Sequence, residues 1–430
     1  MRSTSRRAAE VAAVFLQHGF GWIVDLVDLG RLVPGARESR REVGHSGPEH
    51  LRLAFEELGP TFIKLGQVLS TRPDLMPPEY ESELAVLQDA APTVSEAEIF
   101  GAVEAALGQP LEKTFRLFVG VPIAAASIGQ VHAATLLDGT EVVVKVRRPR
   151  VVEQVTVDLA LLDRLAAVAA RRSSIARRYD PVGLAREFRA TLSAELDYPR
   201  EGNNADLVAA SFAQEENVHI PRVFWDFTRD GVITEERIRG IKVDDLRALD
   251  AAGLDRAKIA RTLADAYLSM VFVHRFFHAD PHPGNVFVEN DNRVAFVDFG
   301  MVGSVTTHTG QGLGTILVAL VATDPTKMAD GLLRLGIASD DVDRNRFERD
   351  LAQIMEKYAR LPLEQLHLGP LIAELMSVVR AHRLRLPSDL ALLLKTVMMC
   401  EGIAAQLDPT FELIPHLLPY AARLASDDTT

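Results

Sequence analysis

The sequence has little of what defines several common classes of protein. Cys400 is the one cysteine among 430 residues, which excludes an internal disulfide and predicts a reducing, cytoplasmic compartment. No internal repeat and no low-complexity tract is found. A secretory signal is not expected, because the segment after the basic residues 1–7 contains Glu10, Asp25 and Asp28 and has no small-residue cleavage pattern.

Positive charge and long apolar runs are also scarce. The formal net charge is −12, and we expect no nucleic-acid partner because phosphate binding needs a cationic surface. A membrane-spanning helix needs about 20 mostly apolar residues. Residues 313–322 are too few, and residues 390–407 are interrupted by Lys395 and Glu401. Any membrane contact is therefore expected to be peripheral, at the inner face of a membrane.

A β-containing half followed by a helical half predicts an α+β protein. The chain is too long for one core, so two or three subdomains are expected. Turn residues at 138–139 and 229–231 separate short apolar runs, which predicts hairpins of residues 131–136 with 141–146 and of 223–227 with 232–237. A polar loop is predicted over residues 34–49. After residue 240 the chain is mostly helical, with one strand pair near 285–298. Further helices are predicted over residues 8–33, 49–58, 60–71, 79–90, 95–107, 151–171 and 182–211.

The most informative stretch reads HADPHPGN at residues 278–285 and is followed by DFG at 298–300. Phosphoryl transfer of the kinase type needs an aspartate near the nucleophile, and an asparagine and a second aspartate that hold magnesium on the phosphates. Asp280 and Asn285 have the separation of the aspartate and asparagine in the kinase catalytic loop. Asp298 follows an apolar strand. We therefore predict Asp280 as a catalytic residue, and Asn285 and Asp298 as magnesium ligands.

The two histidines of this stretch allow another interpretation. His278 and His282 are spaced like a zinc-binding pair, but that arrangement needs a helix to bring both rings to one face. Pro281 and Pro283 forbid such a helix. We expect His278 to have a structural role instead, bracing the loop and the DFG backbone.

A kinase also needs a lysine on its third strand, and the run VVVKV at residues 142–146 supplies Lys145 as a second catalytic residue. A lysine in an apolar strand is costly unless it is paired. The alternative is an ordinary solvent-facing position on an edge strand. Glu201 is the first choice for its ion-pair partner and Glu195 the second, although most acidic residues on helices are merely solvated.

The loop expected to cover the nucleotide phosphates departs from the kinase pattern. Ordinary kinases carry G-x-G-x-x-G, whereas residues 124–131 read AAASIGQV and keep only Gly129. Alanine resists the positive φ angles that glycine permits, so a stiffer loop is expected. The run GQGLG at 310–314 lacks the context of a dinucleotide site and is predicted as flexible backbone. The predicted nucleotide-binding residues are Ala124, Ala125, Ala126, Ser127, Lys145, Glu201, Glu235 and Glu236.

Together these residues resemble the UbiB/AarF family of atypical protein-kinase-like proteins. The resemblance spans about residues 50 to 300. It implies a bilobal protein-kinase-like fold, with an N-terminal helical extension over residues 1–92, an N-lobe with inserted helices over 93–240 and a mainly helical C-lobe over 241–430. Four motifs carry it: KLGQ at 64–67 with STRPD at 70–74, AAASIGQVH at 124–132, ELD at 195–197 with Glu201 and Asn204 behind it, and the HADPHPGN–DFG pair.

The resemblance also implies a function. The family is linked to ATPase activity and to isoprenoid-quinone (ubiquinone-type) or lipid metabolism. ATP, Mg²⁺, quinone precursors or lipid, and quinone-biosynthesis proteins are therefore the expected cofactors and partners. The family further implies a gate, in which Lys64 and Gln67 meet Glu195 and Asp197 and close the site to polypeptide substrates.

Two alternative functions remain, a Ser/Thr protein kinase and a nucleotide-binding pseudokinase scaffold. Against the first, Ala279 replaces the arginine that usually precedes the catalytic aspartate, and no A-P-E triplet follows the DFG. Against the second, Lys145, Asp280, Asn285 and Asp298 are all present.

The N-terminal segment allows two interpretations. An apolar, aromatic helical face beside basic residues suits an anionic membrane interface. Packing of the same helix onto the body of the protein is an equal alternative. The apolar residues are Phe15, Phe20, Trp22, Ile23 and Leu26, and the basic ones are Arg2, Arg6 and Arg7.

Overall fold

A computed structural model describes most of the chain. The described residues are 2–27, 29, 47–70, 72, 75–87, 94–174, 177, 180–337, 342–359, 368–382, 384, 387–417 and 419–420. Most of the polar loop predicted over residues 34–49 lies outside them, as do Thr71, Pro73 and Asp74 of the STRPD motif.

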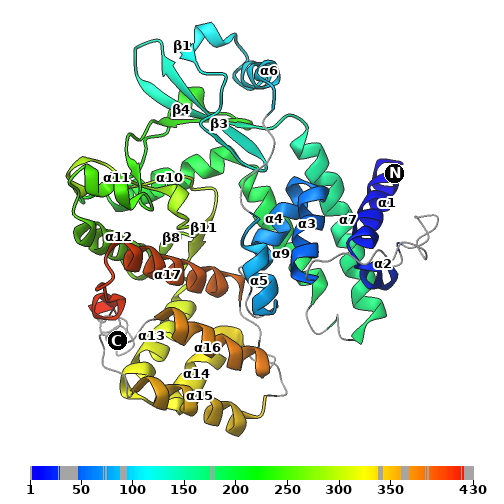
Figure 1. Cartoon of the computed structure of the whole chain (residues 1–430), viewed down its shortest axis with the longest axis vertical. Coiled ribbons are helices and arrows are strands. Elements are labelled where there is room, and N and C mark those ends of the chain that lie inside the picture. Colours follow the sequence, from blue (N-terminus) through cyan, green and yellow to red (C-terminus); the bar gives the residue numbers. More distant parts are fainter. Residues whose placement is uncertain are drawn as a thin grey trace. The chain divides into compact units, whose positions relative to one another are not determined.

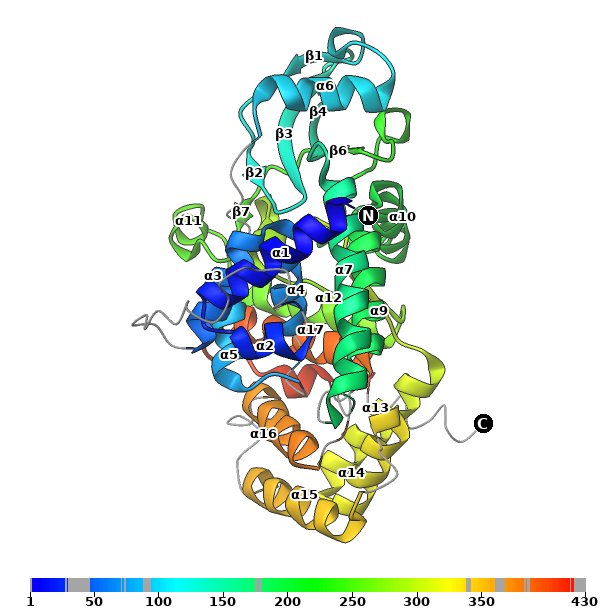
Figure 2. The same cartoon turned by 90° about the vertical axis from the view of Figure 1, so that its right-hand side faces the viewer.

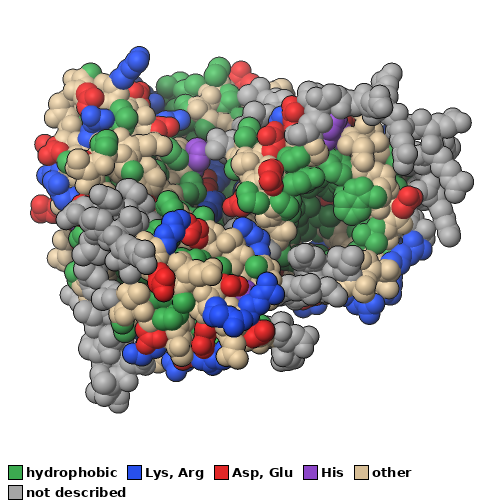
Figure 3. Space-filling view, turned by 60° about the horizontal axis from the view of Figure 1, so that its bottom comes forward, with side chains coloured by type: hydrophobic (Ala, Val, Ile, Leu, Met, Phe, Trp, Pro, Cys, Tyr) green, Lys and Arg blue, Asp and Glu red, His purple; other side chains and the backbone are tan. Residues whose placement is uncertain are grey.

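The chain forms two compact units. Unit 1 comprises Met1–Arg200 and Val223–Arg237, and unit 2 comprises Glu201–Arg222 and Ile238–Thr430. The predicted extension, residues 1–92, thus belongs to the same unit as most of the predicted N-lobe. Figure 3 shows one face of the molecule, on which acidic and basic side chains are interspersed among apolar ones.

Unit 1 contains a five-stranded sheet covered on one face by helix α6 (Glu96–Leu107), as Figures 1 and 2 show. The strand order is β1 (Phe115–Phe118), β3 (Gly129–Leu136), β4 (Glu141–Arg147), β6 (Val232–Glu236), and β2 (Ala124–Ala125) also pairs with β3. The predicted β3–β4 hairpin is confirmed, with Gly139 at φ +92° in its turn. Ile99 and Val103 of α6 are buried with the inward-facing valines of β4.

The second predicted hairpin is only partly correct. The turn at residues 229–231 is present, with Arg229 bridged to Val232. Residues 223–227, however, make only an isolated bridge from Val223 to Glu235 and then a 3-10 turn, Trp225–Phe227. Phe224 and Phe227 both pack on the sheet core, and their spacing suits a helical turn better than the alternation of a strand.

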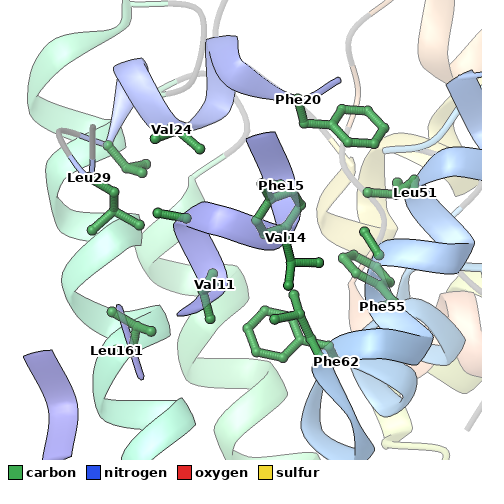
Figure 4. Packing of buried hydrophobic residues seen from close by; sticks show 14 of the residues in the cluster. Val11, Val14, Phe15, Phe20, Val24, Leu29, Leu51, Phe55, Phe62 and Leu161 are labelled. Carbon is green, nitrogen blue, oxygen red and sulfur yellow. The ribbon is translucent and has the colours of Figure 1, made fainter. Parts of the chain in front are cut away.

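The helices of unit 1 form a second cluster with its own core. They are α1 (Arg2–Gln17), α2 (Gly21–Leu26), α3 (Gly47–Leu58), α4 (Pro60–Ser70), α5 (Pro78–Leu84), α7 (Val151–Arg172) and α9 (Pro181–Glu195). Figure 4 shows Val11, Val14 and Phe15 of α1 directed toward Phe55 and Phe62. The Phe15 and Phe55 rings meet edge to face, with centroids 6.4 Å apart.

Of the two interpretations of the N-terminal segment, this packing supports the second, in which the helix packs onto the body of the protein. Phe15 and Phe20 are buried, and Ile23 and Leu26 pack on the same core, so that Trp22, 65% exposed, is the member of the five that faces solvent. Arg7 also points inward and donates to the buried Asp158 at 2.7 Å. The cluster is apolar because it packs onto the other helices of unit 1.

The single helix predicted over residues 182–211 is in fact two. Helix α9 ends at Glu195, and α10 (Tyr198–Ser211) begins three residues later. Pro199 lacks the N–H that a helix interior requires but fits a first turn. Asp197 accepts a hydrogen bond from the Arg200 N–H at 3.0 Å and so caps the new helix.

Unit 2 combines short strands with helices. A four-stranded sheet has the order β5 (Val218–His219), β10 (Val294–Phe296), β9 (Val286–Val288), β7 (Ile241–Lys242), and β8 (Phe276–His278) pairs with β11 (Val302–Ser304). The strand pair predicted near 285–298 is confirmed as β9–β10. The helices are α11 (Leu246–Ala251), α12 (Arg256–Phe272), α13 (Thr307–Ala322), α14 (Pro325–Leu332), α15 (Arg344–Ala359), α16 (Leu368–Ala381) and α17 (Ser388–Leu407).

The prediction of flexible backbone at residues 310–314 is wrong, because these residues lie inside α13. A Cβ on Gly312 would come within 2.5 Å of the Leu335 side chain. The glycine therefore serves close packing between α13 and the segment after α14.

Helix α17 contains the one segment of the described residues, Asp389–Leu407, that is long and apolar enough to cross a membrane. Buried positions make up 44% of it, and the helix packs against α12. Both charged residues in its interior have partners in unit 2. Lys395 donates to Asp280, and Glu401 accepts from the backbone N–H groups of Leu368 and Gly369 at 2.7 and 2.6 Å. These contacts are typical of a core helix.

Candidate active site

The alanine-rich loop of unit 1 is a tight turn held by its neighbours. The Ala126 N–H donates to the Gly129 carbonyl at 2.8 Å, which closes the turn. Arg148 holds it from outside: its Nε donates to the Ala126 carbonyl, and its backbone N–H donates to the Ile128 carbonyl, both at 2.9 Å. Burial lowers the pKa of Arg148 from its ordinary value. Ser127 is buried inside the turn, whereas Ala124 and Ala125 are more accessible.

Gly129 is the one glycine of the loop because Tyr198 lies against it. A Cβ at this position would come within 2.4 Å of the Tyr198 hydroxyl and 3.1 Å of the Val146 carbonyl. Tyr198 is fully buried, and the Lys145 ammonium lies 5.4 Å from the centre of its ring. One aromatic side chain thus contacts both the turn and the predicted catalytic lysine, and a cation over an aromatic face is attracted to it.

Behind the loop, a chain of hydrogen bonds runs through two buried side chains of β3. The Gln130 side-chain oxygen Oε1 accepts from the Val94 N–H at 2.5 Å, and the side-chain nitrogen Nε2 of Gln130 lies 3.4 Å from His132 Nε2. His132 Nδ1 donates to the Val119 carbonyl at 3.0 Å. Because the amide nitrogen can only donate, His132 Nε2 accepts, and the ring is neutral. Burial lowers the pKa of His132.

Two of the four predicted gate residues meet in unit 1. Lys64 of α4 and Glu195 at the end of α9 form an ion pair of 2.5 Å, with side chains 12% and 19% exposed. Arg72 adds a second link between these segments by donating to Glu187 at 3.0 Å. The other two gate residues have different contacts. Gln67 donates to the Leu87 carbonyl at 2.5 Å, and Asp197 caps α10.

In unit 2, strand pairing brings the predicted magnesium ligands to one end of the β9–β10 hairpin. Val286 pairs with Phe296, and one step further the Asn285 carbonyl accepts from the Val297 N–H at 3.0 Å. Asn285 and Asp298 therefore flank the same end of the hairpin. The β8–β11 pair positions the predicted catalytic loop, because the Ala279 N–H donates to the Met301 carbonyl at 3.0 Å.

The expected bracing role of His278 is confirmed. Its fully buried ring donates from Nε2 to the Val297 carbonyl at 3.1 Å and accepts at Nδ1 from the Asp280 N–H at 3.3 Å. The ring also meets Phe299 edge to face at 5.1 Å. His278 therefore ties the backbone before Asp298 to the backbone of Asp280. His282 has a different partner, accepting at Nδ1 from the Gly284 N–H.

The Asp280 carboxylate is contacted on both of its oxygens. The Asn285 amide nitrogen lies 3.3 Å from Oδ2 and 3.1 Å from the Asp280 carbonyl. On the other side, the Lys395 ammonium of α17 donates to Oδ1 at 3.1 Å. The Asp280 side chain is 37% exposed, so it is held in place and still reachable.

Asp298 has a strained backbone that its neighbours hold in place. Its φ is +65°, in the left-handed region that costs a non-glycine residue of the order of 1 kcal/mol or more. Oδ1 accepts from the Gly300 N–H at 3.3 Å. The next residue, Phe299, is fully buried, and its carbonyl accepts from the Asn204 amide at 3.0 Å. Glu201, also on α10, lies beside Gly300.

The donor set of unit 2 fits magnesium on a phosphate group. Mg²⁺ is commonly held by one or two protein oxygens together with substrate phosphates. Because the Asn285 amide nitrogen is used toward Asp280, its side-chain oxygen would be the ligand, and Asp298 would supply a carboxylate. Within the described ranges, no group of three His, Cys, Asp or Glu side chains is arranged to hold a metal by itself.

The remaining predicted residues lie on the sheet of unit 1 and at the start of unit 2. Lys145 is buried in β4, and Glu235 and Glu236 end β6 just before the chain passes to unit 2. Lys145 belongs to unit 1 and Glu201 to unit 2, so their ion pair stays a prediction. Glu195, the second choice, is paired with Lys64 instead.

Comparison with known proteins agrees with this architecture. Residues 86–332 match the ABC1 atypical kinase-like domain, and residues 351–412 match the UbiB helical domain. The chain is 36% identical over 429 residues to the probable protein kinase UbiB of Xylella fastidiosa (strain 9a5c), covering 97% of this chain and 78% of that protein. An uncharacterized protein of Synechocystis is 37% identical over 371 residues, or 86% of this chain, and the alignment spans only 63% of its length.

A solved structure supports the same fold. Rv3197 of Mycobacterium tuberculosis, in a complex with erythromycin, matches with a TM-score of 0.58 and 26% identity, over 82% of this chain and 90% of that one. The fold and site thus define a protein-kinase-like protein with a mainly helical C-terminal region, as predicted. The chain belongs to the UbiB family of ABC1 atypical kinase-like proteins.

Sequence reasoning missed three residues that organise the predicted site residues within each unit: Tyr198 and Arg148 in unit 1, and Lys395 in unit 2. A fully buried tyrosine beside a helix start carries no sequence pattern of its own. Lys395 could have been found, since a lysine in an otherwise apolar helix indicates a buried partner.

Proposed function

We propose that this protein binds Mg-ATP and transfers its terminal phosphoryl group in support of isoprenoid-quinone or related lipid metabolism. The observation that carries the proposal is the arrangement in unit 2, where backbone pairing holds Asp280, Asn285 and Asp298 around one hairpin end. Kinase-type transfer needs these residue types, one as proton acceptor and two as metal ligands.

The proposed step follows from that arrangement. The acceptor oxygen forms a bond to the γ-phosphorus, the bond from that phosphorus to the β–γ bridging oxygen breaks, and ADP leaves with the electron pair. Asp280 accepts the proton of the acceptor hydroxyl, which is either water or an alcohol or phenol. Asn285 and Asp298 would hold the magnesium, which supplies neutralisation of the phosphate charge.

The proposed pathway and the proposed exclusion of polypeptide acceptors rest on different observations. The relatives named probable protein kinase UbiB are the basis for proposing the quinone pathway. The Lys64–Glu195 ion pair joins the KLGQ helix to the ELD motif, as expected for a gate that excludes protein substrates. We propose that these two motifs act together in this role.

ATP turnover by the purified protein tests the proposal. Turnover should require Mg²⁺, should rise when liposomes or phenolic quinone precursors are added, and should be lost in Asp280→Asn. Generic peptides serve as a separate arm, because efficient peptide phosphorylation would favour a Ser/Thr kinase. Turnover that is absent under every condition, or equal in Asp280→Asn, would overturn the proposal.

A further inference from the structure

Helix α17 reaches the catalytic loop with two neighbouring side chains. Lys395 donates to Asp280 Oδ1 at 3.1 Å, and the buried Thr396 hydroxyl lies 3.4 Å from the Ala279 carbonyl. The helix also packs against β11, the strand that follows the DFG. This helix lies in the region that matches the UbiB helical domain, outside the kinase-like match.

The lysine that contacts Asp280 lies outside the predicted catalytic loop. Residues 278–285 contain neither lysine nor arginine. Lys395, which places a positive charge beside Asp280, lies 115 positions further along the chain. Lys395 is also the only basic residue of α17, in a helix that is otherwise mostly apolar.

The contact is well placed to orient the aspartate. Lys395 holds Oδ1 and Asn285 approaches Oδ2, so the carboxylate cannot rotate without losing a donor. The Lys395 side chain is only 22% exposed. A partly buried ammonium is costly without its partner, so the pair is favourable only while both residues remain.

We propose that Lys395 is a positioning residue, which holds Asp280 in the orientation that accepts the proton of the acceptor hydroxyl. The inference rests on the proposed phosphoryl transfer and assigns part of that chemistry to the helical domain. Lys395 acts through Asp280, not through the nucleotide. Its loss should therefore lower kcat and leave the KM for ATP nearly unchanged.

Three substitutions at this position separate charge, hydrogen bonding and bulk. Lys395→Met should lower kcat about tenfold or more, since general-base catalysis contributes about 10²–10⁴-fold and depends on orientation. Lys395→Arg keeps a cationic donor and should recover most of the activity. Lys395→Gln keeps a hydrogen-bond donor without the charge and should give an intermediate kcat. If the Met variant does not fold, the Gln variant provides the test.

A matched control comes from the same unit. Lys357 pairs with Glu374 on the neighbouring helices α15 and α16, and its side chain is 60% exposed. Lys357→Met makes the same change in an ion pair that does not contact the catalytic loop. Its kcat should stay within about twofold of the wild type, because exposed ion pairs contribute little.

The outcomes distinguish this inference from the proposed function. A wild type without Mg-dependent turnover would refute the proposed function, and the inference with it. An active wild type whose kcat is unchanged in Lys395→Met and Lys395→Gln would refute the inference alone. A rise in KM with unchanged kcat would also refute it, since Lys395 would then bind the nucleotide instead of orienting Asp280.

Discussion

The alanine-rich loop of unit 1 and the predicted catalytic loop of unit 2 are held in place by different means. In unit 1, close packing and uncharged hydrogen bonds dominate: Gly129 lies against Tyr198, and Gln130 and His132 form a buried neutral chain. In unit 2, the loop is held mainly by strand pairing and by the ion pair between Lys395 and Asp280. In a loop held by close packing, a substitution that adds bulk should lower the free energy of unfolding. In a loop held by an ion pair, a substitution that removes the charge should lower catalytic activity.

Gly129→Ala should give the largest stability loss. The new methyl group would lie within 2.4 Å of the Tyr198 hydroxyl, so backbone or ring must shift. Overpacking of this kind costs about 1–3 kcal/mol, and we expect the upper part of that range. Denaturant unfolding of the full chain measures this loss of stability.

A second variant sharpens this test. Tyr198→Phe removes the oxygen that the new methyl group would meet, so the double variant should recover part of the stability lost in Gly129→Ala. Strictly additive losses would show that the Tyr198 contact does not set the need for glycine.

Lys64→Ala should give a smaller loss, because it leaves the partly buried Glu195 without this partner. Exposed pairs are worth about 0–1 kcal/mol and the loss of one member of a buried pair about 3–5, so about 1–2 kcal/mol is expected. Arg189→Ala is the control, since Arg189 and Asp163 form an exposed pair in the same unit. Equal effects of the two substitutions would contradict a special role for the Lys64 contact.

The smallest effect concerns pH. Because burial lowers the pKa of His132, the folded state binds its proton only below the ordinary value of 6.5. The unfolded chain takes up this proton first as the pH falls, so stability is lost on acidification below about 6.5, by at most about 1.4 kcal/mol per pH unit. His132→Asn should show a shallower decline in unfolding free energy between pH 7 and pH 5 than the wild type. Identical slopes of unfolding free energy against pH in the two proteins would show that His132 is not held neutral in the folded state.

The features that the sequence predicts correctly are those that depend on residues close together in the chain. The β3–β4 hairpin followed from its Asp138-Gly139 turn, and the β9–β10 pair followed from its apolar runs. The bracing role of His278 followed from the prolines that exclude a helix. The Lys64–Glu195 pair was expected only through the family resemblance, since the two residues are far apart in the chain.

The rest depends on contacts that local pattern does not encode. The break between α9 and α10 was missed although Pro199 marks it, because the apolar pattern continues on both sides. The GQGLG run was misjudged because glycine serves helix packing as well as flexibility. The contact of Lys395 with Asp280 depends on how α17 packs in unit 2.

Nucleotide binding by Asp298→Asn tests whether unit 2 holds Mg-nucleotide at the end of the β9–β10 hairpin. Asparagine tolerates the positive φ of this position, so the fold should survive while a metal ligand is lost. Asp291→Asn is the matched control, because Asp291 has a similar φ of +63° in the turn of the same hairpin. We expect calorimetric titration with Mg-ADP to show binding in the wild type and Asp291→Asn and none in Asp298→Asn. Unchanged affinity in Asp298→Asn would show that Mg-nucleotide does not bind at this end of the hairpin.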